Sequence, residues 1–256
     1  MQNNTAKEKL QQGAVVYGIL SPTTDPVVCE YIGYTGFDLY MMDAEHGAIT
    51  LTEATHIIRA CETAGIPVWA RIRSVDEKLI LQFLDAGISG VMMPGIRTAE
   101  DVRRLVAAVK YPPLGQRGLG PVRAADYLMG RLPQGQYVQW ANDQIVILPQ
   151  IETLKCIENL DEILQVEGVD GFIIGPRDLA MSMGYYDGPA NDEVKHTING
   201  IMAKVRAAGK WVGTVAGTAE QANALTENGA NIILNSVQGL IQSAGKAFLN
   251  EVRKGK

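Results

Sequence analysis

The sequence ILPQIET, residues 147–153, is an apolar run of strand length that ends in a carboxylate, Glu152. A second run, GFIIGPRDL at residues 171–179, ends in another carboxylate, Asp178. The 26 residues that separate the two acids are about what one strand, one helix and one turn occupy in a repeating βα unit. We therefore expect both carboxylates at corresponding ends of neighbouring parallel strands.

Two earlier segments have the same organisation. Residues 38–47, DLYMMDAEHG, contain an apolar run followed by Asp43 and His46, and residues 67–71, PVWAR, end in Arg71, 25 residues after His46. The carboxyl ends of parallel barrel strands meet at one rim, where such enzymes place their chemistry. The sequence thus predicts that His46, Arg71, Glu152 and Asp178 converge.

The whole chain has the pattern of an α/β protein whose strands and helices alternate. Its 256 residues, 46% of them hydrophobic, suffice for one large core. We predict strands at 14–20, 37–43, 67–71, 90–94, 145–151, 171–174, 211–215 and 231–235. We predict helices at 25–34, 52–64, 77–86, 98–109, 154–165, 178–183, 191–208, 218–228 and 237–253. Eight repeats predict a closed (β/α)8 TIM barrel in one domain, residues 1–256, with a polar N-terminal segment at 1–13.

One connection, residues 110–143, is too long for a simple turn and is rich in Gly, Pro and Tyr. Such a connection in a compact domain is usually functional or packed against a partner. Arg117 and Arg123 in it are either substrate or subunit contacts or solvated loop arginines. Gly118 and Gly120 resemble part of a nucleotide-binding loop, but no strand precedes them and the third glycine is missing, which disfavours that interpretation.

Composition excludes several classes of partner. The formal charge of -5, without any run of Lys or Arg, argues against nucleic acid or an anionic membrane as the main partner. We see neither a signal peptide nor a membrane span, so we expect a cytoplasmic protein. Cys29, Cys61 and Cys156 have no metal-type spacing and form no close pair in the sequence, which is typical of core or surface thiols in a reducing compartment.

The three histidines differ in context. His56 and His196 share polar helix faces with charged neighbours and are expected at the surface. His46 follows a strand and stands three residues after Asp43, a spacing that lets a carboxylate hold the imidazole in one tautomer. A lone Asp-x-x-His is a weak signal, and its position among the other strand ends strengthens it.

The two strand-end acids have a structural alternative, because acids there also cap helices, and for Asp178 this is nearly as good an explanation. As a pair without Cys or a nearby His, Glu152 and Asp178 indicate a hard divalent ion, Mg²⁺ or Mn²⁺ before Zn²⁺. About four of roughly six coordination positions would be left for water and substrate oxygens, which is an open Lewis-acid site.

Several short motifs together resemble the HpcH/HpaI family of class II pyruvate aldolases. They occur in order over about residues 13–250 and are FD at 37–38, DAEH at 43–46, Arg71, YPPLGQRG at 111–118, QIET at 150–153, VDG at 169–171 and GPRDL at 175–179. The resemblance implies a barrel of the phosphoenolpyruvate/pyruvate superfamily, whose last helix is exchanged between the subunits of a homo-oligomer, a trimer or hexamer.

The resemblance also implies a role for each residue. Glu152 and Asp178 would bind the metal ion (Mg²⁺, Mn²⁺ or Co²⁺), His46 would be the base, and Arg71 would face the developing enolate. Gln150, Gly175 and the backbone N–H groups of Arg177 and Asp178 would contact the pyruvate part of the substrate. Relatives often have a small residue where this chain has Arg177, which leaves the size and charge of its substrate open.

These roles describe the cleavage of a 4-hydroxy-2-oxo acid to pyruvate and an aldehyde, and the reverse aldol addition. The electrons released from the C3–C4 bond become an enolate that the metal and Arg71 stabilise, while His46 takes the C4 hydroxyl proton. No Lys ends a strand, so a Schiff base has no obvious nucleophile. A CoA-thioester lyase and a metabolite-binding barrel without catalysis remain alternatives.

Asp85, the last predicted catalytic residue, lies in the final turn of the helix at 77–86, where a negative charge opposes the helix dipole. Asp85 is either a structural residue, solvated or paired with a nearby basic side chain, or a functional one. We expect it to be too far from His46 of its own chain to act on it. Because family members place an acid of the adjacent subunit near the catalytic histidine, the resemblance implies that Asp85 reaches a neighbour's His46.

Overall fold

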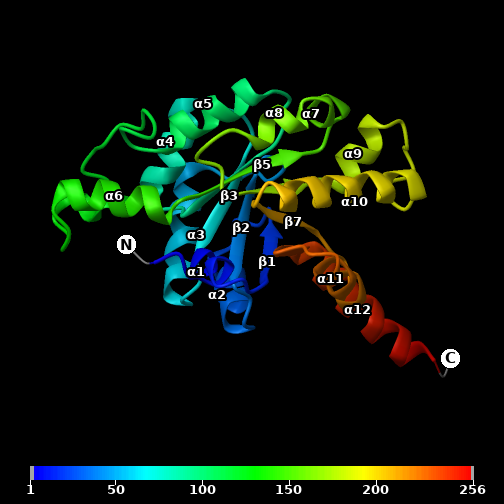
Figure 1. Ribbon diagram of the computed structural model, residues 1–256. Coiled ribbons are helices and arrows are strands. Elements are labelled where there is room, and N and C mark those ends of the chain that lie inside the picture. Colours follow the sequence, from blue (N-terminus) through cyan, green and yellow to red (C-terminus); the bar gives the residue numbers. More distant parts are fainter. Residues whose placement is uncertain (1–2, 255–256) are drawn as a thin grey trace.

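Eight parallel strands close into a barrel in the computed structural model, which describes residues 3–254 (Figure 1). They are β1 (Val16–Ser21), β2 (Leu39–Ala44), β3 (Val68–Ile72), β4 (Gly90–Met93), β5 (Val146–Ile151), β6 (Gly171–Ile174), β7 (Trp211–Val215) and β8 (Ile232–Ser236). Every strand pairs with its sequence neighbours, and β8 returns to β1 with Ile232 opposite Val16. The (β/α)8 barrel predicted from the sequence is confirmed.

The strands are buried on both faces, which explains their nearly continuous apolar sequences. In β2, Leu39 and Met41 point into the barrel and pack with Trp69, whereas Tyr40 and Met42 point outward into the layer below the helices. The interior is thus filled by side chains, and space for a ligand is left only where the strands end.

Helices surround the barrel, and most begin at a residue whose side chain caps them. Thr50 and Thr98 each form a capping box, and Asp76 accepts two backbone N–H groups. The helices that connect successive strands are α2 (Pro26–Tyr34), α3 (Leu51–Thr63), α4 (Glu77–Ala86), α5 (Ala99–Val109), α7 (Leu154–Glu158), α8 (Leu160–Leu164), α9 (Pro176–Ser182), α10 (Asp192–Ala207) and α11 (Ala219–Glu227). Their positions agree with the predicted helices, except that the one expected at 154–165 is divided into α7 and α8.

Part of the N-terminal segment forms a helix that packs on the barrel. Residues Thr5–Gln11 form the helix α1, whose Ala6 and Leu10 are buried against the apolar side chains of the barrel interior. Asn4, which caps this helix, is fully buried. We infer from these contacts that α1 closes the end of the barrel at which the strands begin.

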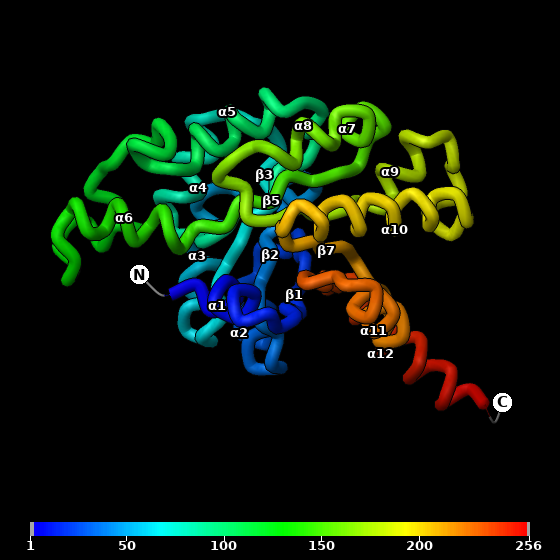
Figure 2. Tube along the Cα trace, in the orientation of Figure 1, coloured from blue at the N-terminus to red at the C-terminus, as the bar shows by residue number. Residues whose placement is uncertain are grey.

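The long connection at 110–143 is largely folded, contrary to its prediction as a loop. It contains the 3-10 helix η1 (Arg123–Leu128) and the helix α6 (Gln134–Gln144), which lie at one side of the barrel (Figures 1 and 2). Neither arginine is a solvated loop residue. Arg117 is 4% exposed and pairs with Asp85, and the half-buried Arg123 pairs with Glu62.

The last helix, α12 (Val237–Arg253), extends away from the barrel (Figure 2). Only Val237 of this helix is buried, while Ile241, Phe248, Leu249 and Val252 are exposed.

Within residues 3–254, no helix is long and apolar enough to span a membrane. All three cysteines are buried and free, and the Cys29 thiol donates a hydrogen bond to the carbonyl oxygen of Asp25.

Candidate active site

A cavity of about 630 Å³ lies at the carboxyl ends of the strands. Its lining includes seven of the predicted site residues: Asp43, His46, Arg71, Gln150, Gly175, Arg177 and Asp178. Strands β2, β3, β5 and β6 and the turns after them deliver these side chains, as the spacing of the strand-end residues predicted. Glu152 does not line the cavity itself, but it accepts a hydrogen bond from the Gln150 side chain, which does.

Arg71 and Asp43 form the best-defined contact of the cavity. The Arg71 guanidinium donates two hydrogen bonds to the Asp43 carboxylate, over 3.0 and 2.7 Å, and both residues are less than 10% exposed. Burial alone would raise the pKa of Asp43, but the hydrogen bonds and charge of Arg71 lower it. Burial would likewise lower the pKa of Arg71, and Asp43 together with Glu45 raises it above its usual value. Both groups therefore stay charged.

The predicted contact between Asp43 and the His46 imidazole is wrong. The Asp43 carboxylate accepts backbone N–H groups of Glu45 and His46, over 3.3 and 3.2 Å, and its remaining hydrogen bonds within residues 3–254 come from Arg71. In the turn after β2, the Asp43 side chain accepts hydrogen bonds from the backbone, and this leaves the imidazole without a contact to Asp43. The His46 side chain is 66% exposed, and its Nε2 lies 3.8 Å from Glu45.

Glu45 is a site residue that the sequence analysis did not select. Its carboxylate lies 3.3 Å from Arg71 Nε. Burial raises the pKa of Glu45, and the positive charge of Arg71 offsets part of this effect. The available signal was its position, because Glu45 stands between Asp43 and His46 at the end of a strand.

Gln150 in β5 and Glu152 just after it are two residues apart, so they lie on the same side of the chain as the barrel-interior residue Leu148, and hydrogen bonds hold them in place. The Gln150 amide donates to Glu152, and the backbone N–H of Gly95 donates to the other Glu152 oxygen over 2.6 Å. Gly175 allows this arrangement, because a Cβ atom there would lie only 2.6 Å from the Gln150 nitrogen. Gln150 is 2% exposed, and its Oε1 has no hydrogen-bond partner among the described residues.

The charges around Glu152 are suited to a bound cation. Burial raises the pKa of Glu152, the Gly95 N–H lowers it, and the nearby carboxylates of Asp178 and Glu45 raise it further. No group of three or more His, Cys, Asp or Glu side chains in the described part of the chain could hold a metal ion. A cation held by Glu152 and Asp178 would therefore take its other ligands from water and substrate, as oxygen-liganded divalent ions commonly do.

Asp85 lies apart from this cavity. It is in the last turn of α4, and barrel helices run antiparallel to the strands, so it lies towards the opposite end of the barrel from His46. Its Oδ1 accepts a hydrogen bond of 3.0 Å from Arg117, whose guanidinium carbon lies 4.4 Å from the centroid of the Tyr111 ring. Burial raises the pKa of Asp85, and Arg117 opposes this shift.

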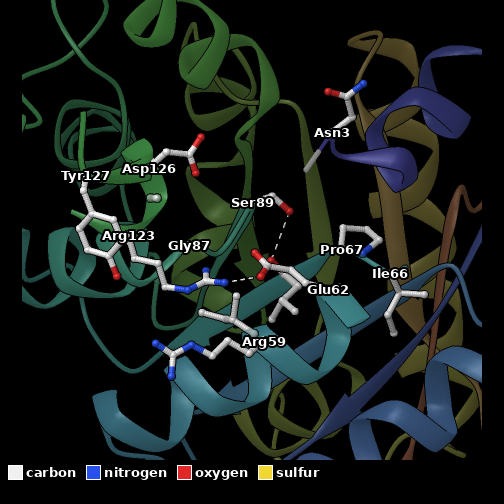
Figure 3. A pocket seen from close by; sticks show the side chains of 13 residues that line it. Asn3, Arg59, Glu62, Ile66, Pro67, Gly87, Ser89, Arg123, Asp126 and Tyr127 are labelled. Carbon is white, nitrogen blue, oxygen red and sulfur yellow. Dashed lines mark hydrogen bonds and ion pairs between the residues drawn. The ribbon is translucent and has the colours of Figure 1, made fainter. Parts of the chain in front are cut away.

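A second cavity, of about 490 Å³, lies near the starts of β3 and β4, where Pro67 and Ser89 contribute to its lining (Figure 3). Arg123 and Glu62, which both line this cavity, form an ion pair. Apart from Arg123, which is paired with Glu62, none of the residues that the sequence analysis considered for the site lines this cavity. The strand-end cavity therefore remains the candidate active site.

Comparisons with known proteins agree with this assignment. Residues 17–242 match the HpcH/HpaI aldolase/citrate lyase family. The chain is 36% identical to 2-keto-3-deoxy-L-rhamnonate aldolase of Escherichia coli (strain K12), over 94% of this chain and 90% of that one.

Two solved structures have the same fold over nearly the whole chain. An HpcH/HpaI aldolase from Desulfitobacterium hafniense DCB-2 has a TM-score of 0.90 at 31% identity, covering 97% of this chain and 96% of its own. Citrate synthase SbnG has a TM-score of 0.87 at 30% identity, covering 97% of each chain. The chain is therefore an aldolase-type enzyme, and it belongs to the HpcH/HpaI aldolase/citrate lyase family.

Proposed function

We propose that the enzyme uses a divalent metal ion at Glu152 and Asp178 to cleave 4-hydroxy-2-oxo acids to pyruvate and an aldehyde, and to catalyse the reverse addition. The observation that supports the proposal is the arrangement at the strand-end cavity, where a buried, charged Arg71 and Asp178 line the wall and Glu152 lies directly behind Gln150, close enough to Asp178 for the two carboxylates to affect each other's charge. The relative from Escherichia coli is named for a 2-keto-3-deoxy acid, which is consistent with a 2-oxo acid substrate.

The residues of the cavity would divide the work as follows. Arg71 stabilises the negative charge that develops on the 2-oxo oxygen, and Asp43 fixes the direction of its guanidinium by two hydrogen bonds. Gln150 and the backbone N–H groups of Arg177 and Asp178, which have no partner within helix α9, hold the carboxylate end of the substrate, and Gly175 leaves the space that this contact needs. A bound divalent ion would supply Lewis-acid stabilisation of the same charge.

We assign the proton transfer at the C4 hydroxyl to His46. Its imidazole lines the cavity and is exposed enough to meet a substrate, and Glu45 is the nearest carboxylate to its Nε2. A general base must reach the proton that it takes, and a tighter contact than the one seen without substrate is common in the reactive complex.

The other expectations from the resemblance are part of the same proposal. Mg²⁺, Mn²⁺ and Co²⁺ are the candidate ions, and the enzyme would act in the cytoplasm. The exposed apolar residues of α12, among them Phe248 and Leu249, support a homo-oligomer in which this helix packs on another subunit. The subunit number, three or six, is what the resemblance implies.

The test is pyruvate release from a panel of 4-hydroxy-2-oxo acids by chelated enzyme, with and without added Mg²⁺, Mn²⁺ or Co²⁺. We expect activity to return with a metal ion. Glu152→Gln and Asp178→Asn should lower kcat/KM by at least about 100-fold and abolish metal binding in equilibrium dialysis, while circular dichroism stays unchanged. The exposed acids Glu158 and Asp161 provide the matched controls Glu158→Gln and Asp161→Asn.

Two outcomes would contradict the proposal in different ways. Pyruvate release that is insensitive to chelation would remove the metal ion from it. Failure to cleave any free oxo acid would remove the aldolase reaction, and cleavage of an acyl-CoA thioester instead would identify the lyase alternative.

A further inference from the structure

We propose that the Arg177 side chain selects substrates whose aldehyde part ends in an anionic group, a carboxylate or a phosphate. This inference rests on the proposed aldolase function and adds the class of the aldehyde to it. It assigns to the side chain of Arg177 a role that is separate from that of its backbone N–H.

The first observation is the position of Arg177 in the cavity. The strand order of the barrel places the turn after β6 between Gln150 on β5 and Ala216 after β7. All three residues line the same 630 Å³ cavity, and the lining continues to Ser236 and Gln238 at the start of α12. A substrate whose 2-oxo acid end contacts Gln150 therefore has room to extend past Arg177.

The second observation is the distribution of charge in the cavity. Arg71 is committed to Asp43 and Glu45. In contrast, Arg177 has no ion-pair or hydrogen-bond partner for its guanidinium among residues 3–254, and no hydrogen bond of its side chain would have to break on binding. The lining beyond Arg177, from β7, β8 and α12, contains no charged side chain. An anionic group there would meet the free cation of Arg177, while the neighbouring carboxylate in the lining, Asp178, is assigned to the metal ion.

The third observation is the set of hydrogen-bond donors on this far wall. Asn235 uses its Oδ1 to accept the Ser236 N–H, which leaves its side-chain NH₂ group available. Ser236 caps α12, and Gly239 keeps this turn compact, because a Cβ there would lie 2.9 Å from Ser236 Oγ. Amide donors on the wall opposite an arginine complement the oxygens of a carboxylate or phosphate.

The other end of the cavity contains an unsatisfied polar atom. Gln150 is 2% exposed, and its Oε1 faces no donor within the described residues. A buried acceptor without a partner is costly, and a small shift of the Gln150 side chain on substrate binding would let a bound water donate to it. The two ends of one cavity thus offer polar contacts to the two ends of one extended substrate.

The experiment compares aldehydes of equal length that end in a carboxylate, a phosphate or a neutral hydroxymethyl group, as acceptors in aldol addition to pyruvate. The measured quantity is the ratio of kcat/KM for each anionic aldehyde to that for the neutral one. We expect this ratio to be about ten in the wild type and to fall to about one in Arg177→Gln. The effect is no larger because the guanidinium is exposed and solvent screens its charge. Arg177→Lys should keep part of the selectivity.

Arg104 supplies a charge-matched control, because it is an exposed arginine of α5 outside the cavity. Arg104→Gln should leave the ratio unchanged. Raising the salt concentration should lower the ratio in the wild type and have little effect on it in Arg177→Gln. Binding of each anionic aldehyde to the metal-free enzyme, followed by calorimetry, should weaken in Arg177→Gln and not in Arg104→Gln.

The outcomes separate this inference from the proposed function. If aldol addition proceeds but Arg177→Gln lowers kcat/KM equally for charged and neutral aldehydes, the side chain does not select charge, and the inference is overturned. If no aldehyde reacts in any variant, the proposed function itself is wrong.

Discussion

Arg71 keeps its positive charge in a mostly buried position because carboxylates surround it. Asp43 accepts two hydrogen bonds, Glu45 lies 3.3 Å away, and Glu152 adds a further negative charge. A buried guanidinium is tolerated only when such partners satisfy it. The acids thus hold a cation at the point where the proposed reaction develops negative charge.

Asp43→Asn tests this arrangement, because it removes one charge and keeps the size of the side chain. We expect a loss of about 3 kcal/mol in the free energy of unfolding at pH 7, as for a buried ion pair with one partner removed. The pKa of Asp43 is lowered in the folded state, so its contribution is complete above the unfolded-state value, about 3.9, and is lost as the pH falls through the folded-state pKa.

Urea denaturation of the wild type and Asp43→Asn between pH 7 and pH 3 would measure this contribution. The difference between the two proteins should be largest at neutral pH and shrink in acid. A difference that is constant over this range would show that the charge of Asp43 does not stabilise the fold.

The positions of the site residues were largely predictable, but their contacts were not. Asp43, Arg71 and Gln150 lie in the last residues of strands, and His46 and Asp178 follow strands, so barrel topology alone brings them to one rim. Which carboxylate pairs with which base depends on turn geometry after β2, where Asp43 satisfies backbone N–H groups and Arg71 instead of the imidazole. Sequence spacing carries no information about these rotamers.

At the scale of the elements, the strands and the helices between them were predicted because hydrophobic periodicity and capping residues coincide. The structure differs from the prediction at α1 and α6, whose sequences TAKEKLQ and QGQYVQWANDQ contain few apolar residues. Tertiary contacts decide their structure. Ala6 and Leu10 of α1, and Tyr137 and Ala141 of α6, are buried. Short polar helices of this kind depend on packing that local sequence does not reveal.

Asn4 attaches α1 to the barrel. Its side-chain amide donates to the carbonyl oxygens of Ser89 and Gln144, each over 2.9 Å, and its Oδ1 accepts from Lys7 and from the indole of Trp69. Asn4→Ala removes all four hydrogen bonds and leaves buried partners unsatisfied. We expect a loss of about 3 kcal/mol, which lowers Tm by about 6–12 °C.

Thermal unfolding followed by circular dichroism provides the measurement, and Gln11→Ala, at an exposed position of the same helix, provides the control. The control should change stability by less than about 0.5 kcal/mol. Catalysis by folded Asn4→Ala at low temperature should be normal, because α1 lies at the end of the barrel away from the site. Equal melting temperatures for the two variants would contradict a role for Asn4 as the attachment point.

At the scale of the whole molecule, one chain leaves apolar surface uncovered. Phe248 is 68% exposed and Ile241 66% exposed on α12, and Tyr31 and Tyr34 of α2 are exposed to a similar extent. Large exposed apolar patches usually mark contacts with another molecule. A homo-oligomer in which α12 packs on a neighbouring subunit would bury this surface, and such an assembly could also complete the active site.

Asp85 is the residue through which subunit assembly would affect catalysis. Within its own chain it lies in the last turn of α4, away from His46, and Arg117 occupies its Oδ1. No hydrogen bond to its Oδ2 occurs within residues 3–254, so this oxygen is available to a partner. The side chain is 21% exposed, enough for contact with another subunit. The prediction is that Asp85 of one subunit orients His46 of the next.

Mixing two inactive variants tests this prediction. His46→Ala and Asp85→Asn should each lose most aldolase activity alone. When their subunits exchange at equal concentrations, roughly a quarter of the sites should combine an intact His46 with an intact Asp85 and regain activity, if each site draws on two chains. Mixing His46→Ala with Arg71→Met should recover nothing, because His46 and Arg71 line the same cavity of one chain. Hybrid oligomers verified by mass spectrometry that remain inactive in the first mixture would show that Asp85 acts within its own subunit or not at all.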